Sequence, residues 1–328
     1  MMNTTLEMRT LGKTSLQVTP IGLGMMEFAG GKGLISRMFP VIPQEDKNAI
    51  VKAALDGGIN WFDTAEMYGN GVSEQSLATA LKAAGKSEHD VVVTTKWFPF
   101  FRTAGNIPRT IDTRLHFLGG YRIGNYMIHN PHSFSSPEAE MNAMADLVEA
   151  GKILSVGVSN FDPARMRRAF NALQKRGLPL AVNQVHYSLL HRDIETNGVL
   201  ETARELGVTI IAYTPLASGM LTGKYHQNPE LLNRQPLWRR SMMKRNLEVS
   251  RPLITALQEI GTQYNATPAQ VALNWLIHFQ GEIIVTIPGA TKVRQAEESA
   301  GAMQFHLSKD DMARLDELSR LIRQSSGR

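Results

Sequence analysis

The sequence predicts a single α/β domain, a (β/α)8 TIM barrel, because eight strand-like runs recur at a nearly even spacing. The runs begin near residues 21, 60, 91, 124, 153, 181, 208 and 283: IGLGM, NWFD, VVVTT, GNYMI, ILSVGVS, AVNQV, VTIIAY and IIVTI. The first seven starts lie 39, 31, 33, 29, 28 and 27 residues apart, close to the roughly 30 residues of a strand, a helix and their turns. Helical patterns fill the intervals and no linker divides the 328 residues, which favours one barrel over residues 1–328.

Helix boundaries between these runs follow recognisable chemistry. Three helices are expected to begin with a polar N-cap residue followed by proline at the first helical position: Ser136-Pro137, Asp162-Pro163 and Thr267-Pro268. Three glycines are expected to end helices just before the next strand: Gly57, Gly151 and Gly207. Sequence signals for helix starts and helix ends therefore support the predicted alternation of strands and helices.

The main alternative fold is a doubly wound sheet with a glycine-rich dinucleotide loop. Its best candidate is GLGMME at 22–27, where Glu27 occupies the position of the third glycine. The match is incomplete, and the even spacing over the whole chain favours the barrel.

Three segments lie outside the repeat. Residues 8–19 alternate and turn at Gly12-Lys13, as a β-hairpin closing the barrel floor would. Residues 217–265 interrupt the seventh unit with a long insertion loop and an extra helix. Residues 308–322 open with the capping pattern Ser308-Lys309-Asp310-Asp311. This C-terminal helix places four apolar residues on one face: Met312, Leu315, Leu318 and Ile322.

Composition limits the classes of function. Hydrophobic residues make up 43% of the chain and charged residues 20%, as in globular proteins, and the net charge is 35 − 30 = +5. Basic residues gather locally only at Arg239, Arg240, Lys244 and Arg245, without an Arg-rich arm or zinc pattern, so no nucleic-acid partner is expected. The mild basicity fits either an anionic cofactor or a solvated surface without a partner.

Cysteine is absent, which excludes disulfides, thiolate nucleophiles and zinc–sulfur sites. The opening MMNTTLEMRT lacks the apolar segment of a secretory signal. No run approaches the roughly 20 apolar residues that span a bilayer. We therefore expect a cytoplasmic protein that does not associate with membranes.

Four polar residues follow the predicted strands at a regular spacing. Asp63, Lys96 and His129 end three successive strands and lie 33 residues apart, and Tyr68 lies in the loop after the first of them. In barrels of this type the active site is formed at the carboxyl ends of the strands. Ser159, Asn160, Gln184 and Tyr213 end the next three strands. Burying so many polar groups at one rim costs free energy unless they are hydrogen-bonded. A packed core has no use for them, so their presence favours a functional site.

The four residues suit proton transfer to an oxygen atom. An unperturbed tyrosine has a pKa of about 10, and a nearby ammonium such as Lys96 is expected to lower it, with Asp63 holding the ammonium in place. His129 could orient a carbonyl oxygen, so the group resembles the acid that carbonyl reduction needs. Singly, each has a structural reading: Asp63 as a turn cap, Tyr68 as an exposed turn aromatic, Lys96 as a snorkelling side chain and His129 as a hydrogen-bonded loop residue.

Seven stretches in order along the chain resemble the aldo-keto reductase superfamily, and its bacterial members with a short C-terminal tail in particular. They are FDTAEMYGNGVSE (62–74), TTK (94–96), MIHNP (127–131), GKILSVGVSNF (151–161), VNQVHYS (182–188), AYTPLASGMLTGKY (212–225) and IPGATKVRQAEES (287–299). The resemblance implies a barrel that binds NADP(H) without a Rossmann domain. It also implies Tyr68 as proton donor, Lys96 and Asp63 as the pair that lowers its pKa, and His129 as the group orienting the carbonyl.

The resemblance further implies a set of cofactor-binding residues. Ser159, Asn160 and Gln184 would hold the nicotinamide carboxamide, and Tyr213 would stack on the ring, although a strand-end core aromatic is an equal reading for Tyr213 alone. The pyrophosphate path would be lined by Thr214, Leu216 and Ser218. The adenine end would be formed by Gly289, Lys292, Arg294 and Glu298.

The adenine end is also where the sequence departs from the family pattern. Gly289-Ala290, Gln295 and Ser299 stand where many members have Lys-Ser, Arg and Asn. Lys292 and Arg294 could still bind a 2′-phosphate, so NADP(H) is the expected cofactor and NAD(H) the second option.

The expected substrate is a small-molecule aldehyde or ketone. The pocket is expected to be lined by apolar residues of the surrounding loops: Met25, Met26, Phe28, Trp97, Phe98, Phe100, Phe101 and Trp238. Arg102 is expected at the surface, with contact to an anionic group as the lesser option. A homo-oligomer is compatible with the sequence.

Two other functions remain open at this stage. One is a Schiff-base lyase using Lys96, and the other a non-catalytic or slow nicotinamide-binding regulatory subunit of the same fold. No metal site is expected, since His129 and His132 have no suitably spaced carboxylate.

Overall fold

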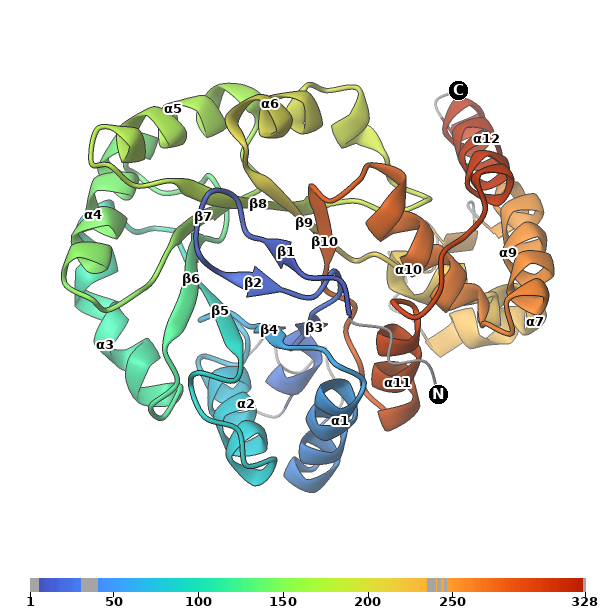
Figure 1. Ribbon diagram of the computed structural model, residues 1–328, viewed down its shortest axis with the longest axis horizontal. Coiled ribbons are helices and arrows are strands. Elements are labelled where there is room, and N and C mark those ends of the chain that lie inside the picture. The colour runs from blue at the N-terminus through green and yellow to red at the C-terminus, as the bar shows by residue number, and fades with distance from the viewer. Residues whose placement is uncertain (1–5, 31–40, 235–239, 241–242, 245–246, 327–328) are drawn as a thin grey trace.

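Eight parallel strands form the sheet of the barrel in a computed structural model, which describes residues 6–30, 41–234, 240, 243–244 and 247–326 (Figure 1). The strands pair in chain order: β3 (Leu23–Gly24), β4 (Trp61–Asp63), β5 (Val92–Trp97), β6 (Ile123–Ile128), β7 (Val156–Ser159), β8 (Leu180–His186), β9 (Thr209–Tyr213) and β10 (Ile284–Thr286). Parallel bridges from Ile21 to Thr286 and from Gly24 to Gly289 join the first strand to the last. The predicted (β/α)8 fold is confirmed.

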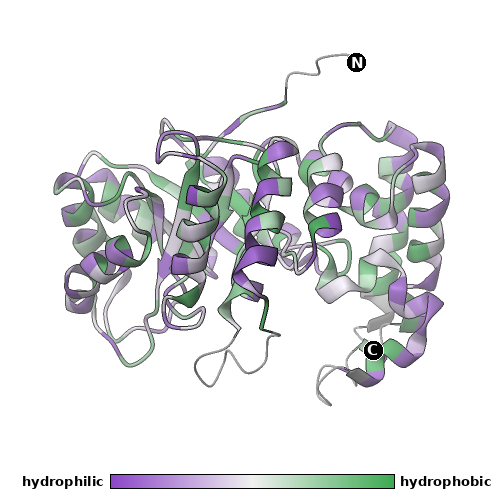
Figure 2. Cartoon of the chain, turned by 90° about the horizontal axis from the view of Figure 1, so that it is seen from below, coloured by the Kyte–Doolittle hydropathy of each residue, from purple (hydrophilic) through white to green (hydrophobic). Residues whose placement is uncertain are grey.

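A helix follows each strand and packs outside the sheet, as Figure 1 shows. The eight helices are α1 (Gln44–Asp56), α2 (Val72–Ala83), α3 (Ile107–Phe117), α4 (Pro137–Glu149), α5 (Pro163–Gln174), α6 (Val199–Leu206), α10 (Pro268–Phe279) and α11 (Val293–Gly301). Three short 3-10 helices lie in the loops: η1 (Met26–Ala29), η3 (Ala104–Asn106) and η4 (Asp193–Glu195). Polar and apolar residues mix along these peripheral helices (Figure 2), which suits a position between core and solvent.

The predicted helix boundaries are confirmed. The Ser136 and Asp162 side chains accept hydrogen bonds from the backbone N–H groups of Ala139 (3.2 Å) and Arg165 (2.8 Å), and Thr267 forms a capping box with Gln270. Gly57 and Gly207 cap α1 and α6, and Gly151 follows the cap of α4.

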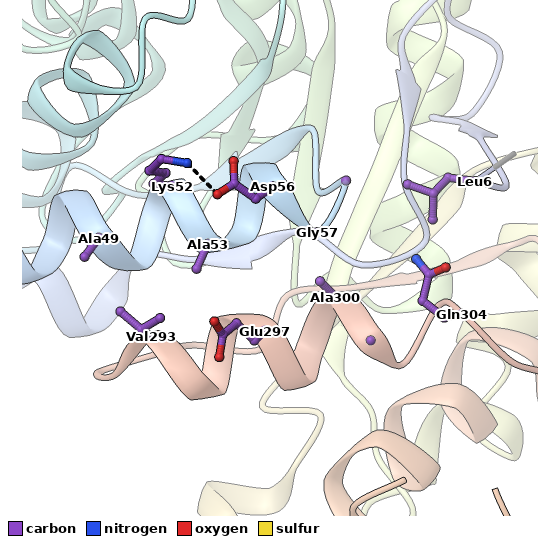
Figure 3. A pocket seen from close by; sticks show the side chains of 12 residues that line it. Leu6, Ala49, Lys52, Ala53, Asp56, Gly57, Val293, Glu297, Ala300 and Gln304 are labelled. Carbon is purple, nitrogen blue, oxygen red and sulfur yellow. Dashed lines mark hydrogen bonds and ion pairs between the residues drawn. The ribbon is translucent and has the colours of Figure 1, made fainter. Parts of the chain in front are cut away.

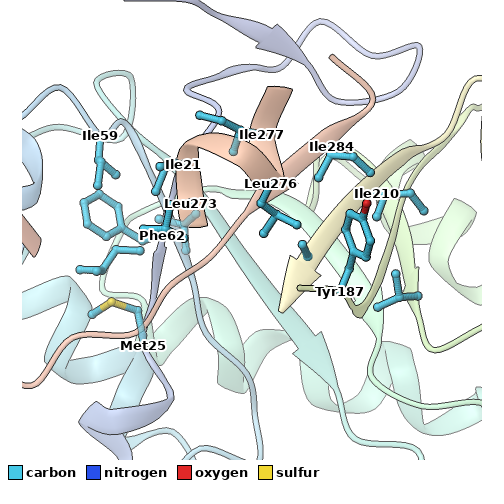
Figure 4. Close-up of a cluster of buried hydrophobic side chains, with 14 of the residues drawn as sticks. Ile21, Met25, Ile59, Phe62, Tyr187, Ile210, Leu273, Leu276, Ile277 and Ile284 are labelled. Carbon is cyan, nitrogen blue, oxygen red and sulfur yellow. The ribbon is translucent and has the colours of Figure 1, made fainter. Parts of the chain in front are cut away.

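Two apolar layers form the core. The larger lies between the strands and the helices, where α10 contributes Leu273, Leu276 and Ile277 (Figure 4). The smaller combines inward-facing strand residues with Leu11 and Val18 of the N-terminal hairpin. The inner layer therefore joins the hairpin to the barrel.

The hairpin consists of antiparallel strands β1 (Arg9–Thr10) and β2 (Gln17–Val18). It contacts the first residues of two barrel strands: the Arg9 guanidinium donates to the Ile284 carbonyl, and the Gly12 N–H donates to the Thr209 hydroxyl at 2.8 Å. Gly12 has φ +55°, and a Cβ there would lie 2.5 Å from the Ala181 carbonyl oxygen, so a side chain cannot fit without movement. The predicted floor hairpin over residues 8–19 is confirmed.

The insertion after β9 is more helical than predicted. Short helices η5 (Ala217–Thr222), α7 (Lys224–Gln227) and η6 (Pro229–Arg234) replace much of the expected loop, and α9 (Arg251–Gln263) is the extra helix. A small apolar core supports these turns: Met220, Tyr225, Leu232, Met243 and Leu247. Each short helix of the insertion buries apolar residues of its own. The stability of the insertion therefore does not depend only on contacts with the barrel.

The C-terminal helix α12 (Lys309–Ser326) runs four residues beyond the predicted end. Leu315 and Ile322 are buried, and Met312 and Leu318 pack partly buried against the core. The Ser308 hydroxyl accepts from the Asp311 N–H at 3.1 Å, as the capping pattern predicts. The role of α12 is therefore to pack its apolar face against the core of the barrel.

Candidate active site

Asp63, Lys96 and His129 meet at the carboxyl ends of three adjacent strands. Asp63 is the last residue of β4 and His129 follows β6, whereas Lys96 lies inside β5, which extends two residues beyond the β-branched run at 91–95. The buried Lys96 ammonium forms an ion pair with the Asp63 carboxylate and donates to the Thr64 carbonyl at 2.8 Å. The Thr94 hydroxyl donates to the second Asp63 oxygen at 2.6 Å. These contacts fix the ammonium at the barrel mouth.

Tyr68 completes the group from the turn after β4. Its ring centroid lies 5.2 Å from Lys96 Nζ and 5.8 Å from the centroid of the His129 ring, which meets it edge-on at 82°. A hydrogen bond of 3.0 Å from the Tyr68 N–H to the Ala65 carbonyl shapes the turn. Phenol, imidazole and ammonium therefore face one small region.

The electrostatics of Tyr68 differ from the expectation. Desolvation raises the pKa of the Tyr68 phenol well above its usual value, and the Asp63 carboxylate raises it further. The predicted net lowering of this pKa is wrong, because burial of the phenol and the Asp63 carboxylate dominate the shift. The phenol therefore holds its proton at neutral pH, as a proton donor must.

His129 is neutral in this environment. Burial, with a smaller effect of the Lys96 charge, lowers the pKa of His129 to about 3. Its Nδ1 atom is buried and has no hydrogen-bond partner among the described residues. A neutral imidazole can donate one hydrogen bond to a ligand without carrying a charge.

Polar side chains from the next strands connect to this group by hydrogen bonds. Gln184 Nε2 donates to Asp63 Oδ2 at 3.0 Å. Asn160 Nδ2 donates to Ser159 Oγ at 3.0 Å, and the Tyr213 hydroxyl donates to Asn160 Oδ1 at 3.0 Å. The Ser159 hydroxyl donates to the Gln184 carbonyl at 2.9 Å, so the three residues predicted for the carboxamide and Tyr213 lie in one network beside Asp63, with donors and acceptors suited to a primary amide.

Tyr213 is supported from behind by two histidines. The His186 ring stacks on Tyr213 with centroids 5.3 Å apart and an 11° angle, and His191 stacks on His186 at 3.8 Å. Sequence reasoning missed both residues, because their stacking depends on strand β8 and the turn that follows it. The stack holds the Tyr213 ring as a flat platform.

The loop after β9 has a backbone suited to anions. Thr214, Ala217 and Ser218 have φ near +50°, and Gly219 follows at +87°. Such left-handed residues can point successive N–H groups into one concavity that binds phosphate oxygens. Leu216 is half-buried within this loop.

Lys224 is a cation that sequence reasoning missed. A Cβ on Gly219 would lie 2.7 Å from Lys224 Nζ, so the ammonium lies against this loop. Desolvation, with a contribution from the charge of Lys292, lowers the pKa of Lys224. The signal was available in the GKY sequence at 223–225. Lys224 and Lys292 together favour a bound anion.

Two of the predicted adenine-end residues contact each other. Arg294 and Glu298 form an ion pair with each other at 2.5 Å. Gln295 caps α11, because its Oε1 accepts from the N–H groups of Thr291 (2.8 Å) and Lys292 (3.1 Å). At Gly289 a Cβ would lie 2.3 Å from a carboxylate oxygen of Glu27, so the Glu27 side chain would have to move to admit a larger residue.

The apolar pocket expected from the sequence is smaller in the structure. Met25, Phe28 and Trp97 are 0% exposed and belong to the core. Trp97 follows Lys96 in β5, and successive strand residues face opposite sides, so Lys96 faces the barrel interior and Trp97 the helices. Trp238 lies outside the described residues, whereas Met26, Phe100 and Phe101 are exposed.

Arg102 is part of an ion pair. Its Nη1 contacts both Glu66 carboxylate oxygens, at 2.8 and 2.9 Å. The expected surface position is only partly correct, because 31% of the side chain is exposed.

Other features of the described chain offer less chemistry. Over the described ranges, no cluster of three or more His, Asp or Glu side chains is placed to bind a metal, and no helix is long and apolar enough to cross a membrane. A surface groove between α1 and α11 contains none of the candidate site residues; Lys52, Asp56, Val293 and Glu297 are among its lining residues (Figure 3). The strand-end site is therefore the best candidate.

Comparisons with known proteins agree with this geometry. A model of the Aldo/keto reductase family matches residues 20–320. This chain belongs to the aldo/keto reductase family. It is 38% identical to an uncharacterized oxidoreductase of Mycobacterium bovis, covering 95% of this chain and 93% of the relative. It is 34% identical to the chloroplastic pyridoxal reductase of Arabidopsis thaliana, covering 92% and 83%.

A solved structure shares the fold. It is a thermostable aldo-keto reductase in complex with the inhibitor epalrestat, with a TM-score of 0.77, 28% identity and coverage of 95% of this chain and 100% of that one. Membership of the family makes this chain an oxidoreductase that acts on carbonyl compounds with a nicotinamide cofactor. The Schiff-base and regulatory alternatives are not favoured.

Proposed function

We propose that this protein reduces aldehydes or ketones to alcohols with NADPH, and that Tyr68 donates the proton. The observation that carries the proposal is a phenol packed between an imidazole and a buried ammonium, where burial raises the pKa of the phenol. When bound, the reduced nicotinamide supplies the hydride to the carbonyl carbon. Tyr68 supplies the proton to the carbonyl oxygen.

Each member of the group has a distinct task. The neutral His129 donates a hydrogen bond that orients the carbonyl oxygen, and Tyr68 transfers its proton as negative charge develops there. The Lys96 ammonium stabilises the phenolate left behind, and Asp63 and Thr64 keep it from moving away. Solvent then restores the proton to Tyr68.

The cofactor fits the residues present. The network of Ser159, Asn160 and Gln184 suits the carboxamide, and the stacked Tyr213 suits one face of the nicotinamide ring. The left-handed loop at 214–219 suits the pyrophosphate. Lys224 and Lys292 support a preference for NADPH, because ammonium groups bind the additional phosphate of that cofactor. A relative in Schizosaccharomyces pombe is named with NADP(+).

Turnover of a carbonyl panel tests this proposal. NADPH oxidation is followed with aldehydes and ketones for the wild type and for Tyr68→Phe, with NADPH binding measured for both. We expect the variant to bind NADPH normally and to lose roughly 10²–10⁴-fold in kcat, the usual contribution of a positioned acid. Turnover that survives the loss of the phenol would show that another group donates the proton. Tight NADPH binding without turnover of any carbonyl would instead support the regulatory subunit.

A further inference from the structure

A buried carboxylate in the barrel wall has no role in the proton transfer proposed so far. It belongs to Glu74, in the first turn of α2. One of its oxygens accepts from the Thr95 hydroxyl of β5 at 2.7 Å, and the other forms an ion pair of 2.8 Å with the buried Arg114 of α3. We call these three residues the Glu74 cluster. Burying a charge costs free energy, which an apolar residue in the same wall would avoid.

The Glu74 cluster is connected to Lys96 through strand β5. Thr95 immediately precedes Lys96, and successive strand residues face opposite sides of the sheet, so Thr95 faces the helices and Lys96 the barrel interior. Desolvation lowers the pKa of the Lys96 ammonium, and the negative charges of Asp63 and, to a smaller extent, Glu74 oppose this lowering. The ammonium is therefore under the influence of two carboxylates, one inside the barrel and one behind the strand.

The cluster is also connected to the turn that carries Tyr68. Ser73 precedes Glu74 at the start of α2, and the Ser73 N–H donates to the Tyr68 carbonyl at 3.2 Å. The Ser73 hydroxyl accepts from the Thr64 hydroxyl at 2.8 Å, and the Thr64 carbonyl binds the Lys96 ammonium. The contacts of Glu74 with β5 and α3 thus fix the start of α2, and with it the position of Tyr68 relative to Lys96.

The charge of Glu74 depends on the groups that surround it. Burial raises the pKa of Glu74 to about 7, and its two partners in the cluster lower it. Glu66 of the loop after β4 raises this pKa and Lys96 of β5 lowers it, both by smaller amounts. Tyr126 of β6 also faces the cluster, and burial raises the pKa of its phenol, so this ring stays neutral. The carboxyl of Glu74 is therefore the group in this wall that changes its charge near neutral pH.

We propose that Glu74 is a positioning residue for proton transfer, and that its carboxylate form holds the Tyr68 turn against the strand of Lys96. The same negative charge stabilises the ammonium from behind. Protonation removes the charge that pairs with Arg114 and weakens both effects, so carbonyl reduction slows when Glu74 becomes neutral. The inference rests on the proposed reductase function and names the group that gives this function a pH dependence.

The pH dependence of the chemical step tests this role. The single-turnover rate of NADPH oxidation is measured from pH 5 to pH 9 for the wild type, Glu74→Gln and Glu140→Gln. Glu140 is a matched control, because it is a buried glutamate of α4 whose pKa burial also raises to about 7. We expect the rates of the wild type and the control to rise by about 2- to 30-fold through a midpoint near pH 7. The rate of Glu74→Gln should not depend on pH, and a midpoint that persists in this variant or vanishes in Glu140→Gln would overturn the proposal.

A shift of the midpoint distinguishes titration of Glu74 from a general loss of structure. Thr95→Val removes a hydrogen bond that lowers the pKa of Glu74 and keeps the ion pair with Arg114, so the midpoint should move to higher pH. Thr95→Ser retains a hydroxyl and should titrate like the wild type. A midpoint in Thr95→Val that is unchanged, or that moves to lower pH, would contradict the assignment to Glu74.

Nuclear magnetic resonance separates this inference from the proposed reaction. Tyrosine is isotopically labelled at the ring carbon that bears the hydroxyl, and the Tyr68 signal is assigned with Tyr68→Phe. We expect this signal to shift with a midpoint near pH 7 in the wild type and not in Glu74→Gln. A Tyr68 signal that does not respond to pH in the wild type would overturn the proposal. Titration without turnover of any carbonyl would uphold the connection between Glu74 and Tyr68 and would count against the proposed reaction alone.

Discussion

The buried ion pair of Glu74 and Arg114 gives a stability prediction with a definite pH dependence. The pair joins α2 to α3 at 2.8 Å, with side chains 0% and 2% exposed, and Glu74 also accepts from the Thr95 hydroxyl at 2.7 Å. Burial raises the pKa of Glu74 to about 7, while Arg114 lowers it. Arg114→Met removes the lowering effect, so the pKa of Glu74 in the folded variant lies above that of the wild type.

The sign of the effect follows from this pKa. The unfolded carboxyl titrates near 4.5 and the folded one at about 7 or higher, so the folded state binds the proton more tightly. The stability of the variant therefore falls as pH rises through this window. At pH 8 the folded variant must either bury an unpaired carboxylate or keep a proton that the unfolded chain releases, and we expect a loss of about 3–5 kcal/mol in either case. At pH 5 Glu74 is protonated in the folded variant, and most of that loss disappears.

Urea denaturation at pH 5 and pH 8 measures this difference. The fluorescence of Trp61, Trp97 and Trp275, all 0% exposed, reports unfolding. The double variant Glu74→Gln/Arg114→Met should recover much of the stability at pH 8 and lose the pH dependence. Arg176→Met, at an exposed ion pair, should change stability far less. A loss in Arg114→Met that is equal at both pH values would refute the reasoning.

Three further predictions concern the active site. Because the pKa of His129 is about 3, kcat/KM for reduction should show no inflection from this residue between pH 5 and 8; an inflection near 6.5 that vanishes in His129→Gln would contradict this. Lys292→Glu should raise the apparent KM for NADPH by about 10-fold or more and that for NADH much less, as steady-state kinetics with both cofactors will show. His186→Ala should weaken NADPH binding by about 2- to 12-fold through loss of the stack on Tyr213. His186→Phe should retain most of it, and equal titration results for both variants would argue against the stack.

The sequence was sufficient for the barrel and for the positions of the strand-end residues. Even strand spacing is a local property, and the rule that sites lie at the carboxyl ends of strands then brought Asp63, Lys96 and His129 together. Predicting the barrel and placing these residues at one rim both require only the order of strands and helices along the chain. Their proximity could therefore be predicted without a structure, whereas the catalytic roles remain to be tested.

What could not be predicted depends on long-range packing. Glu74 and Arg114 are 40 residues apart in sequence and meet only because α2 and α3 are neighbours. The sequence predicts that Trp97 lines the substrate pocket. The register of β5 instead turns its side chain away from the barrel interior and toward the helices. The predicted net lowering of the Tyr68 pKa was wrong because burial of the phenol and the nearby Asp63 carboxylate outweigh it, and neither can be judged from residue types.

The hydrogen bond from Gln184 to Asp63 means that the proposed cofactor pocket and the proposed proton donor, Tyr68, adjoin one carboxylate. Asp63 accepts from Gln184 on one oxygen and from Lys96 on the other. A ligand that draws the Gln184 amide toward itself withdraws a donor from Asp63, and the carboxylate then holds the ammonium more strongly. With the proposed roles, occupancy of the cofactor pocket would change the charge environment of Tyr68 through these two contacts, and thermodynamic reciprocity would then require the protonation of the phenol to influence ligand affinity.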